Sequence, residues 1–552
     1  MMQFRRLWIL VVVTAVVTAV TQACKGPKRK VAEGEICGVT TKDYHKYAGI
    51  PYAEPPIGTL RWKNPQPKRP WKGVLSCTKH CHECLQSALF TSVAKGHEDC
   101  LCLNVYVPKV QNPKNLPVMV WIHGGAFVGG SGNSDMYNPK RLVAEGVIAV
   151  TLNYRLGTLG FLNFGTPDAP GNQGLMDQFF ALKWVKKNIK VFGGDPDKIT
   201  IFGESAGSVS VHMHTLSPLS RNYFVRAIAQ SGSALNPWAF NETTSCSNEK
   251  LLAITNCPAP KGNDTSATFE CLRRVDGKKL QAPTSQFICP DKDKSGGLLA
   301  FSPSLDGQFL PSDPMSLATQ CNSVSMMVGC NSAEGIITLP TLRVKLGYQT
   351  WTKHIQNGYG MDQLGVNCSM STDLLSKWGA LARKHFLNDQ DLSEANVAGF
   401  VRYSSYFSFI WGMNLAINQR ASCPNAKPQY LYVFDSNTIL NHAKQLFGGV
   451  TLQGAAHADE LAYLFDFAVD VVLLMMPKDA KMTQKRMVKL WANYAKYGNP
   501  TPQTDKLLTS TWPAYSTNES NYLLINNAGI HASKNPFAED TRFYEQIISE
   551  CK

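Results

Sequence analysis

The chain has 552 residues, of which 44% are hydrophobic and 17% charged, with 42 Gly and 31 Pro. This composition is typical of a globular protein and excludes a collagen, a coiled coil and a mainly disordered chain. Lys and Arg number 55 against 41 Asp and Glu, which gives a formal net charge of +14. Charge alone fits nucleic acid, an acidic surface or no specific partner. The N-terminus decides how the 16 cysteines are interpreted.

Residues 1–23 have the pattern of a secretory signal peptide. Arg5 and Arg6 precede a mostly apolar run over residues 7–20, and Ala23 ends a small-residue cleavage site. The run is too short to span a bilayer, and no later stretch is long enough. The C-terminus has neither a retrieval tetrapeptide nor a hydrophobic anchor tail. We therefore expect a secreted, extracellular protein without a membrane anchor.

Cleavage after residue 23 leaves 552 − 23 = 529 residues, and the loss of two arginines lowers the charge from +14 to +12. Part of the remaining charge lies in a short basic arm at residues 25–30. No basic motif with interleaved aromatic residues predicts nucleic-acid binding. We interpret the basic balance as a property of the surface rather than a code for a partner.

Export makes disulfides the expected state of most cysteines. A cluster of Cys and His at residues 77–84 superficially resembles a zinc site, but its spacing fits no common finger, and we predict no metal. Four N-x-Ser/Thr sequons agree with export and are expected glycosylation sites: Asn241, Asn263, Asn367 and Asn518.

No repeat, low-complexity tract or linker divides the chain, so we predict one large domain over residues 24–552. A loop-rich region with six prolines between residues 51 and 70 comes first. Apolar runs of strand length then alternate with helical patterns, which predicts an α/β fold with a mainly parallel sheet flanked by helices. The expected strands are 118–122, 147–152, 199–202, 227–229, 326–329 and 430–434, and the clearest helix is 178–189.

A G-x-S-x-G sequence at residues 203–207 lies between the strand at 199–202 and an apolar segment with helical character. In a nucleophile elbow the turn is so sharp that strand and helix approach closely, which requires glycine on both sides of the serine. The serine then projects above the sheet edge. Because the bare pattern occurs often by chance, its setting between strand and helix carries the prediction that Ser205 is a nucleophile.

A serine hydroxyl needs a histidine base and a carboxylate that orients this base. In this fold class the acid follows the serine and the histidine comes last. Glu334, directly after the strand at 326–329, and His457, in a Gly/Ala-rich loop, satisfy this order. Order and spacing alone leave other acids and histidines open: Asp306, Asp459 and Asp466, and His354, His442 and His531.

The oxyanion of an acyl-transfer intermediate needs preorganised backbone N–H donors. Residues 123–127, His-Gly-Gly-Ala-Phe, directly follow the strand at 118–122 and match the HGGG-type loop of esterases. We expect the N–H groups of Gly125, Ala126 and Ala206 to be the donors, and His123 to be structural. An ordinary glycine turn is the alternative.

With these motifs in place, the chain resembles the type-B carboxylesterase/cholinesterase family of α/β-hydrolases. In detail it is similar to the secreted insect carboxylesterases, including those that clear ester odorants. Further matching stretches run nearly end to end, at 47–53, 98–101, 153–157, 171–178, 192–196, 491–496, 498–500 and 512–513.

The resemblance implies a triad of Ser205, Glu334 and His457 in a gorge at the C-terminal edge of the sheet. Other implied positions are polar neighbours of the triad at Glu204, Ser231 and Asp459, an acyl pocket near Trp238 and Phe301, and the disulfides Cys84–Cys100 and Cys257–Cys271. Either pocket aromatic is equally well an ordinary core residue. Pairing among the remaining nearby cysteines stays open, because Cys102 departs from the family pattern.

We therefore predict a secreted serine esterase that hydrolyses small-molecule carboxylic esters through an acyl-enzyme on Ser205, without metal or organic cofactor. Odorant, pheromone or xenobiotic esters are candidate substrates. Between Cys84 and Cys100 the chain has no tryptophan to hold a choline cation, and Phe90 is the only aromatic residue, so acetylcholine is not the expected substrate.

Two alternative functions remain. Juvenile hormone esterases typically have glutamine where this chain has Glu204, which disfavours that function without excluding it. Neuroligin-type members of the family are non-catalytic binding proteins, but they typically lose the serine or histidine or add a transmembrane helix. The sequence leaves the natural ester and the oligomeric state open.

Overall fold

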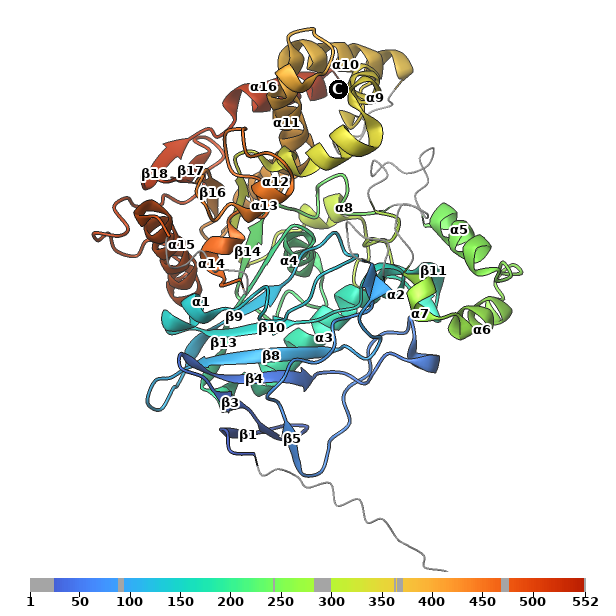
Figure 1. Ribbon diagram of the computed structural model, residues 1–552, viewed down its shortest axis with the longest axis vertical. Coiled ribbons are helices and arrows are strands. Elements are labelled where there is room, and N and C mark those ends of the chain that lie inside the picture. Colours follow the sequence, from blue (N-terminus) through green and yellow to red (C-terminus); the bar gives the residue numbers. More distant parts are fainter. Residues whose placement is uncertain are drawn as a thin grey trace, which may run out of the picture.

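The computed structural model describes residues 24–87, 94–241, 244–281, 299–361, 364, 371–467 and 476–550. Within these residues an 11-stranded sheet has the order β18-β17-β16-β15-β14-β13-β9-β10-β8-β4-β3. The strands from β17 to β10 run parallel, and those at both ends of the order pair antiparallel with their neighbours. Helices flank this sheet (Figure 1), which confirms the expected α/β-hydrolase architecture.

The strands of the large sheet are β3 (Val39–Thr40), β4 (Tyr44–Pro51), β8 (Cys102–Pro108), β9 (Leu116–Ile122), β10 (Ile148–Leu152), β13 (Gly194–Glu204), β14 (Arg226–Gln230), β15 (Ser325–Asn331), β16 (Tyr430–Phe434), β17 (Asn521–Ile525) and β18 (Ile530–Lys534). Five of the six expected strands fall within them, and the sixth, 147–152, begins one residue before β10. Each is an apolar run buried on both faces. The strands β3, β4 and β18 carry no such run, and neither they nor the interior strands β8 and β17 were predicted from the sequence.

The helices are α1 (Lys140–Ala144), α2 (Gly157–Phe161), α3 (Gln173–Asn188), α4 (Ala206–Leu216), α5 (Ser245–Thr255), α6 (Ser266–Arg274), α7 (Gly277–Leu280), α8 (Pro314–Ala318), α9 (Tyr348–Gln356), α10 (Thr372–Leu387), α11 (Val397–Ser405), α12 (Trp411–Ala421), α13 (His442–Leu446), α14 (Leu461–Leu464), α15 (Lys478–Tyr497) and α16 (Ala538–Ser549). The expected helix at 178–189 is α3, which begins five residues earlier. Gly174 hides that first turn from the apolar pattern; a Cβ there would lie 2.5 Å from the carbonyl oxygen of Arg155, so close packing requires glycine.

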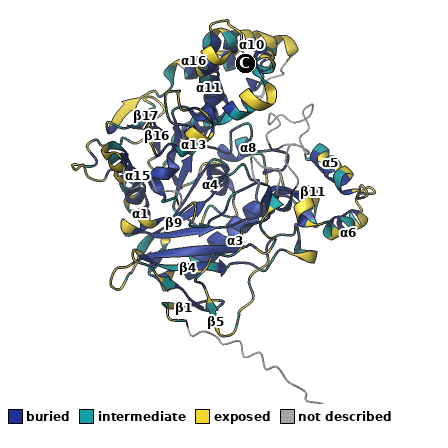
Figure 2. Ribbon diagram, viewed as in Figure 1, coloured by how far each residue is buried: buried dark blue, intermediate teal, exposed yellow. Residues whose placement is uncertain are grey.

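The alternation of side chains along β9 divides the core into two layers. Val118, Val120 and Ile122 join the core cluster that contains α3 and α4. Met119 and Trp121 point the other way, into the cluster that contains α15. Figure 2 shows the sheet buried between these layers, with exposed residues on the outer helix faces. In the part of the chain that the structure describes, no helix is both long and apolar enough to cross a membrane.

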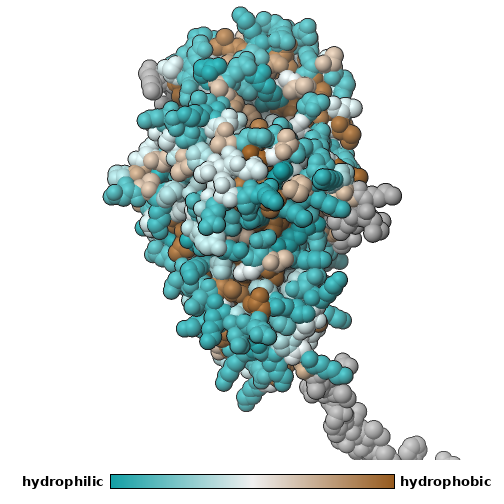
Figure 3. Space-filling view, turned by 90° about the vertical axis from the view of Figure 1, so that its left-hand side faces the viewer, coloured by the Kyte–Doolittle hydropathy of each residue, from teal (hydrophilic) through white to brown (hydrophobic). Residues whose placement is uncertain are grey.

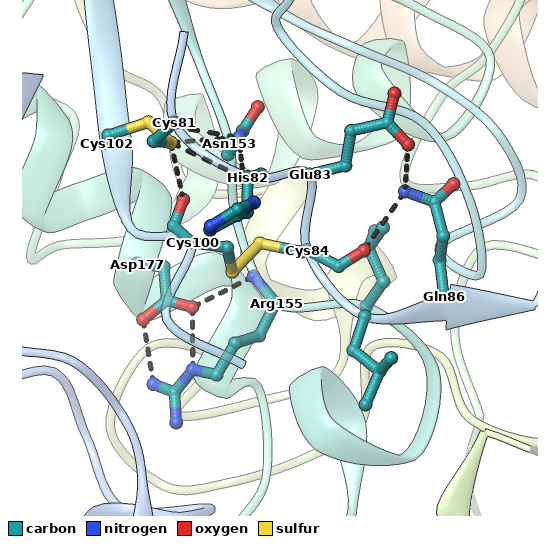
Figure 4. The surroundings of a disulfide bond; sticks show 12 residues. Cys81, His82, Glu83, Cys84, Gln86, Cys100, Cys102, Asn153, Arg155 and Asp177 are labelled. Atoms are coloured by element: carbon teal, nitrogen blue, oxygen red, sulfur yellow. Dashed lines mark hydrogen bonds and ion pairs between the residues drawn. A yellow bond between two sulfur atoms is a disulfide. The ribbon is translucent and has the colours of Figure 1, made fainter. Parts of the chain in front are cut away.

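Disulfides fix the segment that leads into β8 and connect the end of α5 to α6. Cys84–Cys100 and Cys257–Cys271 form as the resemblance implied, with Cα–Cα distances of 4.9 and 5.7 Å. Cys102 pairs with Cys81, which settles the pairing that the sequence left open. Figure 4 shows these two neighbouring bridges together with the buried ion pair of Arg155 and Asp177.

Further bridges join Cys24 to Cys37 and Cys321 to Cys423. Of the described cysteines, Cys77 and Cys330 are buried free thiols. In the Cys/His cluster at residues 77–84, two of the three sulfurs are therefore committed to disulfides.

Candidate functional site

Ser205 lies at the turn between β13 and α4, with φ 58° and ψ −124°. A positive φ is strained for a residue with a side chain and is retained only where its surroundings enforce it. Here the Ser205 N–H donates to the carbonyl of Gln230 on β14 at 2.9 Å, while its own carbonyl accepts from Val209 in α4. The serine is partly exposed, whereas its chain neighbours Glu204 and Ala206 are buried.

The glycines on both sides of Ser205 permit the close approach that the motif predicts. A Cβ on Gly203 would lie 2.6 Å from the backbone of Gly207. A Cβ on Gly207 would lie 2.1 Å from the carbonyl oxygen of Ile122, the last residue of β9. The strand, the helix and the adjacent strand thus meet at distances that only glycine allows.

Glu334 and His457 form a buried pair beside this turn. Glu334 follows β15 and begins the short helix η4 (Glu334–Thr338), and its Oε1 accepts the N–H of Asn331 at 2.7 Å. Its other oxygen, Oε2, lies 2.6 Å from Nδ1 of His457. Glu334 is 0% and His457 4% exposed. A carboxylate on Nδ1 orients the ring and makes Nε2 the nitrogen free to act as a base.

The Nε2 atom of His457 lies 3.0 Å from Oε1 of Glu204, the residue before Ser205. Among the described residues, Ser205 Oγ has no hydrogen-bond partner. The structure thus brings Glu334 and His457 together next to the serine, with the imidazole bridging two glutamates. Catalytic hydrogen bonds are often long or absent before substrate binds, so this geometry is compatible with a role for Ser205.

A third carboxylate completes the cluster around the imidazole. Glu460 accepts hydrogen bonds from Gln230 (3.0 Å) and Asn331 (2.6 Å). Burial raises the pKa of Glu460 to about 7, and burial likewise raises the pKa of Glu204 to about 8. Burial alone would lower the pKa of His457, but the charges of Glu204 and Glu334 outweigh it and raise the pKa to about 9.

Asp459 fixes the loop that carries His457. Its carboxylate accepts hydrogen bonds from the N–H of Ala456 (2.7 Å), the N–H of Lys444 (3.0 Å) and the side chain of Asn441 (2.8 Å). Ser231, at the end of β14, is 0% exposed with φ 56°, and its Oγ has no partner among the described residues. Of Asp459 and Ser231, Asp459 is thus connected to the imidazole through the hydrogen bonds that hold its loop.

The glycine-rich loop after β9 lies against the serine. A Cβ on Gly124 would come within 3.1 Å of Ser205 Cβ and 2.5 Å of the Glu204 carbonyl. Gly125 and Ala126 adopt positive φ, 106° and 53°, and the Gly125 carbonyl accepts the N–H groups of Val128 and Gly129. None of the N–H groups of Gly125, Ala126 and Ala206 donates to another described residue, so all three remain available to a ligand.

His123 is part of the scaffold of this loop. It is 0% exposed, its Nδ1 lies 2.8 Å from the carbonyl oxygen of Gly124, and its ring stacks on Tyr154 at 4.4 Å. Burial lowers the pKa of His123 to about 4, so the ring stays neutral. These contacts match the structural role expected from the sequence.

The competing acids and histidines are engaged elsewhere. Asp306 accepts the N–H groups of a turn at residues 308–310, and Asp466 pairs with Arg141. His354 stacks on Tyr359, and His531 is exposed on β18. His442 begins α13 and packs edge-on against Phe467.

One aromatic side chain that the sequence did not single out covers the imidazole. Phe409 lies in the π-helical segment η8 (Tyr406–Ile410), with its ring centroid 4.5 Å from that of His457. Trp238 packs on Phe409 at 5.8 Å and donates its Nε1–H to the carbonyl of Ser408 at 2.7 Å. Trp238 therefore lies one ring away from His457. Phe301 is 2% exposed, and its place in a pocket remains a prediction.

Two residues near the imidazole were thus missed, and only one had a signal in the sequence. Glu460 lies in the H-A-D-E stretch at residues 457–460 that carried part of the resemblance. Phe409 lies in no motif, because its position depends on the helical distortion at η8. The sequons at Asn263 and Asn518 are exposed, Asn241 is 8% exposed, and Asn367 lies outside the described residues, as does Phe90.

Three features lie together at one edge of the mainly parallel sheet: a serine at a strand–helix turn, a buried Glu–His pair and a glycine-rich loop. Together they define the α/β-hydrolase class. A model of the carboxylesterase family matches residues 25–544. The chain therefore belongs to the carboxylesterase family, and it is a carboxylic ester hydrolase that acts on small-molecule esters.

Relatives named as a lipase and as esterases match most of the chain. It is 34% identical over 506 residues to the bile salt-activated lipase of Mus musculus, covering 88% of this chain and 80% of the lipase. It is 35% identical over 486 residues to the juvenile hormone esterase of Tribolium castaneum, covering 84% and 81%. It is 32% identical over 542 residues to the acetylcholinesterase of Electrophorus electricus, covering 88% and 82%. The resemblance drawn from the motifs is confirmed.

Proposed function

We propose that the protein is a secreted serine esterase that forms an acyl-enzyme on Ser205, with Glu334 and His457 completing the triad. The observation that carries this proposal is the buried contact of 2.6 Å between Glu334 Oε2 and His457 Nδ1, beside the strained serine. That contact leaves Nε2 as the basic nitrogen, on the side of the ring that faces the segment Glu204–Ser205.

In the proposed reaction, His457 Nε2 removes the proton of Ser205 Oγ as the oxygen attacks the ester carbonyl carbon. The N–H groups of Gly125, Ala126 and Ala206 stabilise the oxyanion of the tetrahedral intermediate. The imidazolium then protonates the leaving alkoxide as the C–O bond breaks. Water, deprotonated by His457, attacks the acyl-enzyme and releases the acid and the free serine. Glu334 stabilises the imidazolium throughout.

For His457 to act on Ser205, its Nε2 must exchange Glu204 for the serine oxygen. A Cβ on Gly124 would lie 3.0 Å from Glu204 Oε2 and 3.1 Å from Ser205 Cβ, so the two side chains lie close together and the exchange needs only a local movement of the ring. We assign Glu204, Asp459 and Ser231 to the surroundings of the triad, and Trp238 and Phe301 to the acyl pocket. Phe409, which covers the imidazole, joins this pocket.

Labelling by a fluorophosphonate probe tests the assignment. We expect the probe to modify Ser205, as read by mass spectrometry of the labelled peptide, and Ser205→Ala to abolish both labelling and hydrolysis of an aryl ester. Ser422→Ala, at the exposed end of α12, is the matched control and retains both. Labelling at another serine, or full activity of Ser205→Ala, would exclude the mechanism. An unreactive Ser205 would favour the non-catalytic binding role.

Secretion is a separate part of the proposal, supported by the pattern of residues 1–23 and by the five described disulfides. We expect a mature domain that starts at Cys24 and carries glycans on exposed sequons such as Asn263 and Asn518. N-terminal sequencing of the exported protein tests the cleavage, and the change in mass on glycosidase treatment tests the glycans. A retained N-terminus would contradict cleavage.

Juvenile hormone is the second candidate substrate, favoured by the 35% identity to an enzyme named juvenile hormone esterase. Steady-state kcat/KM values on alkyl esters of increasing acyl length, on juvenile hormone and on acetylthiocholine separate the candidates. We expect simple alkyl esters to be preferred and acetylthiocholine to be poor. A kcat/KM for juvenile hormone well above that of all alkyl esters would assign the second function instead.

A further inference from the structure

The end of the molecule formed by β1 (Lys28–Val31), β2 (Gly34–Cys37) and β5 (Val74–Ser76) carries an excess of positive charge. These strands form a three-stranded sheet beside the large one. Figure 1 shows it at the opposite end of the molecule from α9 and α10. Eight cationic side chains belong to this surface, which we call the basic pole: Lys25, Lys28, Arg29, Lys30, Lys42, Lys109, Lys187 and Lys190.

Contacts between distant segments unite these cations on one surface. The guanidinium of Arg29 lies 5.9 Å from the centroid of the Tyr47 ring on β4, and Tyr47 packs at 5.0 Å on Phe192 of the short helix η2 (Ile189–Phe192). Lys190 lies in the same helix, so its positive charge lies on the same surface as that of Arg29 on β1.

The turn between β3 and β4 extends this surface. Lys109 Nζ donates to the carbonyls of Thr41 (3.4 Å) and Lys42 (3.3 Å) at this turn. Burial lowers the pKa of His45, and the positive charges of Arg29 and Lys109 lower it further. One positive field is therefore shared by three parts of the surface. They are residues 25–30, residues 42–45 together with Lys109, and residues 187–190.

The carboxylates of this surface are already paired. Glu33 binds Lys187 at 3.0 Å, Glu35 faces Lys28 at 3.8 Å, and Asp43 binds Lys140 at 3.4 Å. Lys30, Lys42 and Lys190 are exposed and have no acidic partner among the described residues. A polyanion that binds such free cations releases its condensed counterions, which favours association.

We propose that the basic pole binds an extended sulfated polysaccharide. The cations are spread over three segments rather than gathered in a pocket, which suits a polymer better than a small anion. The choice of an extracellular polymer rests on the secretion proposed above. Figure 3 shows mostly hydrophilic side chains over this narrow end of the molecule.

Nucleic acid and membranes fit this surface less well. Binding of single strands relies on exposed aromatic platforms for the bases. Here Tyr47 is 0% exposed, and Trp71 is only partly exposed and donates its Nε1–H to the carbonyl of Glu35. A lipid surface is bound by helices that insert an apolar face. The basic pole is instead built mainly of strands and turns, with three separate, medium-sized exposed apolar residues, Val74, Val110 and Val191.

Chromatography of the full mature chain on immobilised heparin tests the proposal. The test variant is Lys30→Glu/Lys42→Glu/Lys190→Glu. The matched control is Lys345→Glu/Lys353→Glu/Lys384→Glu, which makes the same change in net charge at the opposite end of the molecule. These three lysines are exposed and lie on η5 (Thr341–Leu346), α9 and α10. We expect the wild type and the control to be retained at about 0.15 M NaCl, and the test variant to elute earlier.

In solution, the slope of log K against log salt should fall in magnitude by about 2 to 3 for the test variant alone, since each cation removed lowers it by about 0.7 to 0.9 for nucleic-acid polyanions. Equal loss in both variants, or no retention of the wild type, would overturn the proposal. Equally salt-resistant binding to single-stranded DNA or to phosphatidylglycerol vesicles would overturn the choice of ligand. Hydrolysis of an aryl ester by the resin-bound enzyme reports the proposed catalytic function separately.

Discussion

His457 Nε2 lies 3.0 Å from Glu204 Oε1, so the imidazole contacts the residue before the serine rather than the serine itself. The opposite nitrogen, Nδ1, is held by Glu334 at 2.6 Å. An imidazole between two carboxylates is stabilised in its protonated form. A general base must be unprotonated. The charge of Glu204 therefore influences the pH above which His457 can act as a base, and so the pH range of activity.

The first prediction concerns the pH profile of Glu204→Gln. The ionised Glu204 favours the imidazolium and contributes to the raised pKa of about 9 for His457. Its removal lowers that pKa, so the acidic limb of kcat/KM against pH should move to lower pH, by about 1 to 3 units. Glu204→Asp keeps the charge and should move the limb less. An acidic limb that stays in place in Glu204→Gln would show that this carboxylate does not act on His457.

The second prediction concerns Glu334→Gln. The amide keeps the shape of the side chain but removes the charge that stabilises the imidazolium and fixes its tautomer. We expect kcat for an aryl ester to fall by about 10⁴, with KM little changed. Glu460→Gln, in the same cluster but without a hydrogen bond to His457, is the control and should lose far less. Comparable losses in both variants would assign the effect to the cluster rather than to Glu334.

Much of the site could be predicted because it rests on local geometry. The elbow at residues 203–207 needs glycine at two fixed positions, and the loop after β9 needs small residues where the backbone approaches Ser205. Those requirements are visible in the sequence. The choice of Glu334 over Asp306 or Asp466 is not local, because it depends on which loop of the sheet edge faces His457. Only the family resemblance carried that choice before the structure.

Other features depend on tertiary packing that leaves little trace in the sequence. The strands β3, β4 and β18 lack long apolar runs, because they are buried less evenly than β10 or β16. Phe409 reaches the imidazole because η8 is wound as a π-helix, and no motif marks such a distortion. The pairing of Cys81 with Cys102 likewise follows from how the segments before and after Cys100 lie in space.

The third prediction concerns the disulfide Cys84–Cys100. It closes a loop of 16 residues, and its removal as Cys84→Ser/Cys100→Ser should lower the free energy of unfolding by about 3 kcal/mol. Cys77→Ala, which alters a buried free thiol nearby, is the control and should cost about 1 kcal/mol. Denaturant unfolding followed by fluorescence measures both. Equal midpoints for the two variants would mean that the bridge contributes little.

The buried thiol of Cys77 can also be tested by its chemical reactivity. Burial raises the pKa of the Cys77 thiol to about 12, so very little thiolate is present at neutral pH. Iodoacetamide should therefore leave Cys77 unmodified in the native protein and alkylate it after unfolding without reductant. Native alkylation of Cys77 would contradict its burial.

The fourth prediction concerns Phe409, whose ring lies 4.5 Å from that of His457 and packs against Trp238. A phenyl ring in this position restricts the space beside the imidazole, where the acyl chain of a bound ester would lie. Phe409→Leu removes part of that ring while keeping an apolar side chain. We expect the ratio of kcat/KM for a hexanoate to that for an acetate to rise about tenfold.

Phe407→Leu is the matched control, because Phe407 lies in the same η8 segment but packs on Tyr359 and Tyr403 instead of His457. Both substitutions shrink a buried phenylalanine and should lower the thermal midpoint similarly, so a stability effect alone cannot separate them. Only Phe409→Leu should change the acyl-length ratio, since only its ring borders the imidazole. If both variants change the ratio equally, loosening of η8 sets the acyl preference. If the ratio is unchanged in Phe409→Leu, the acyl chain lies on another side of His457.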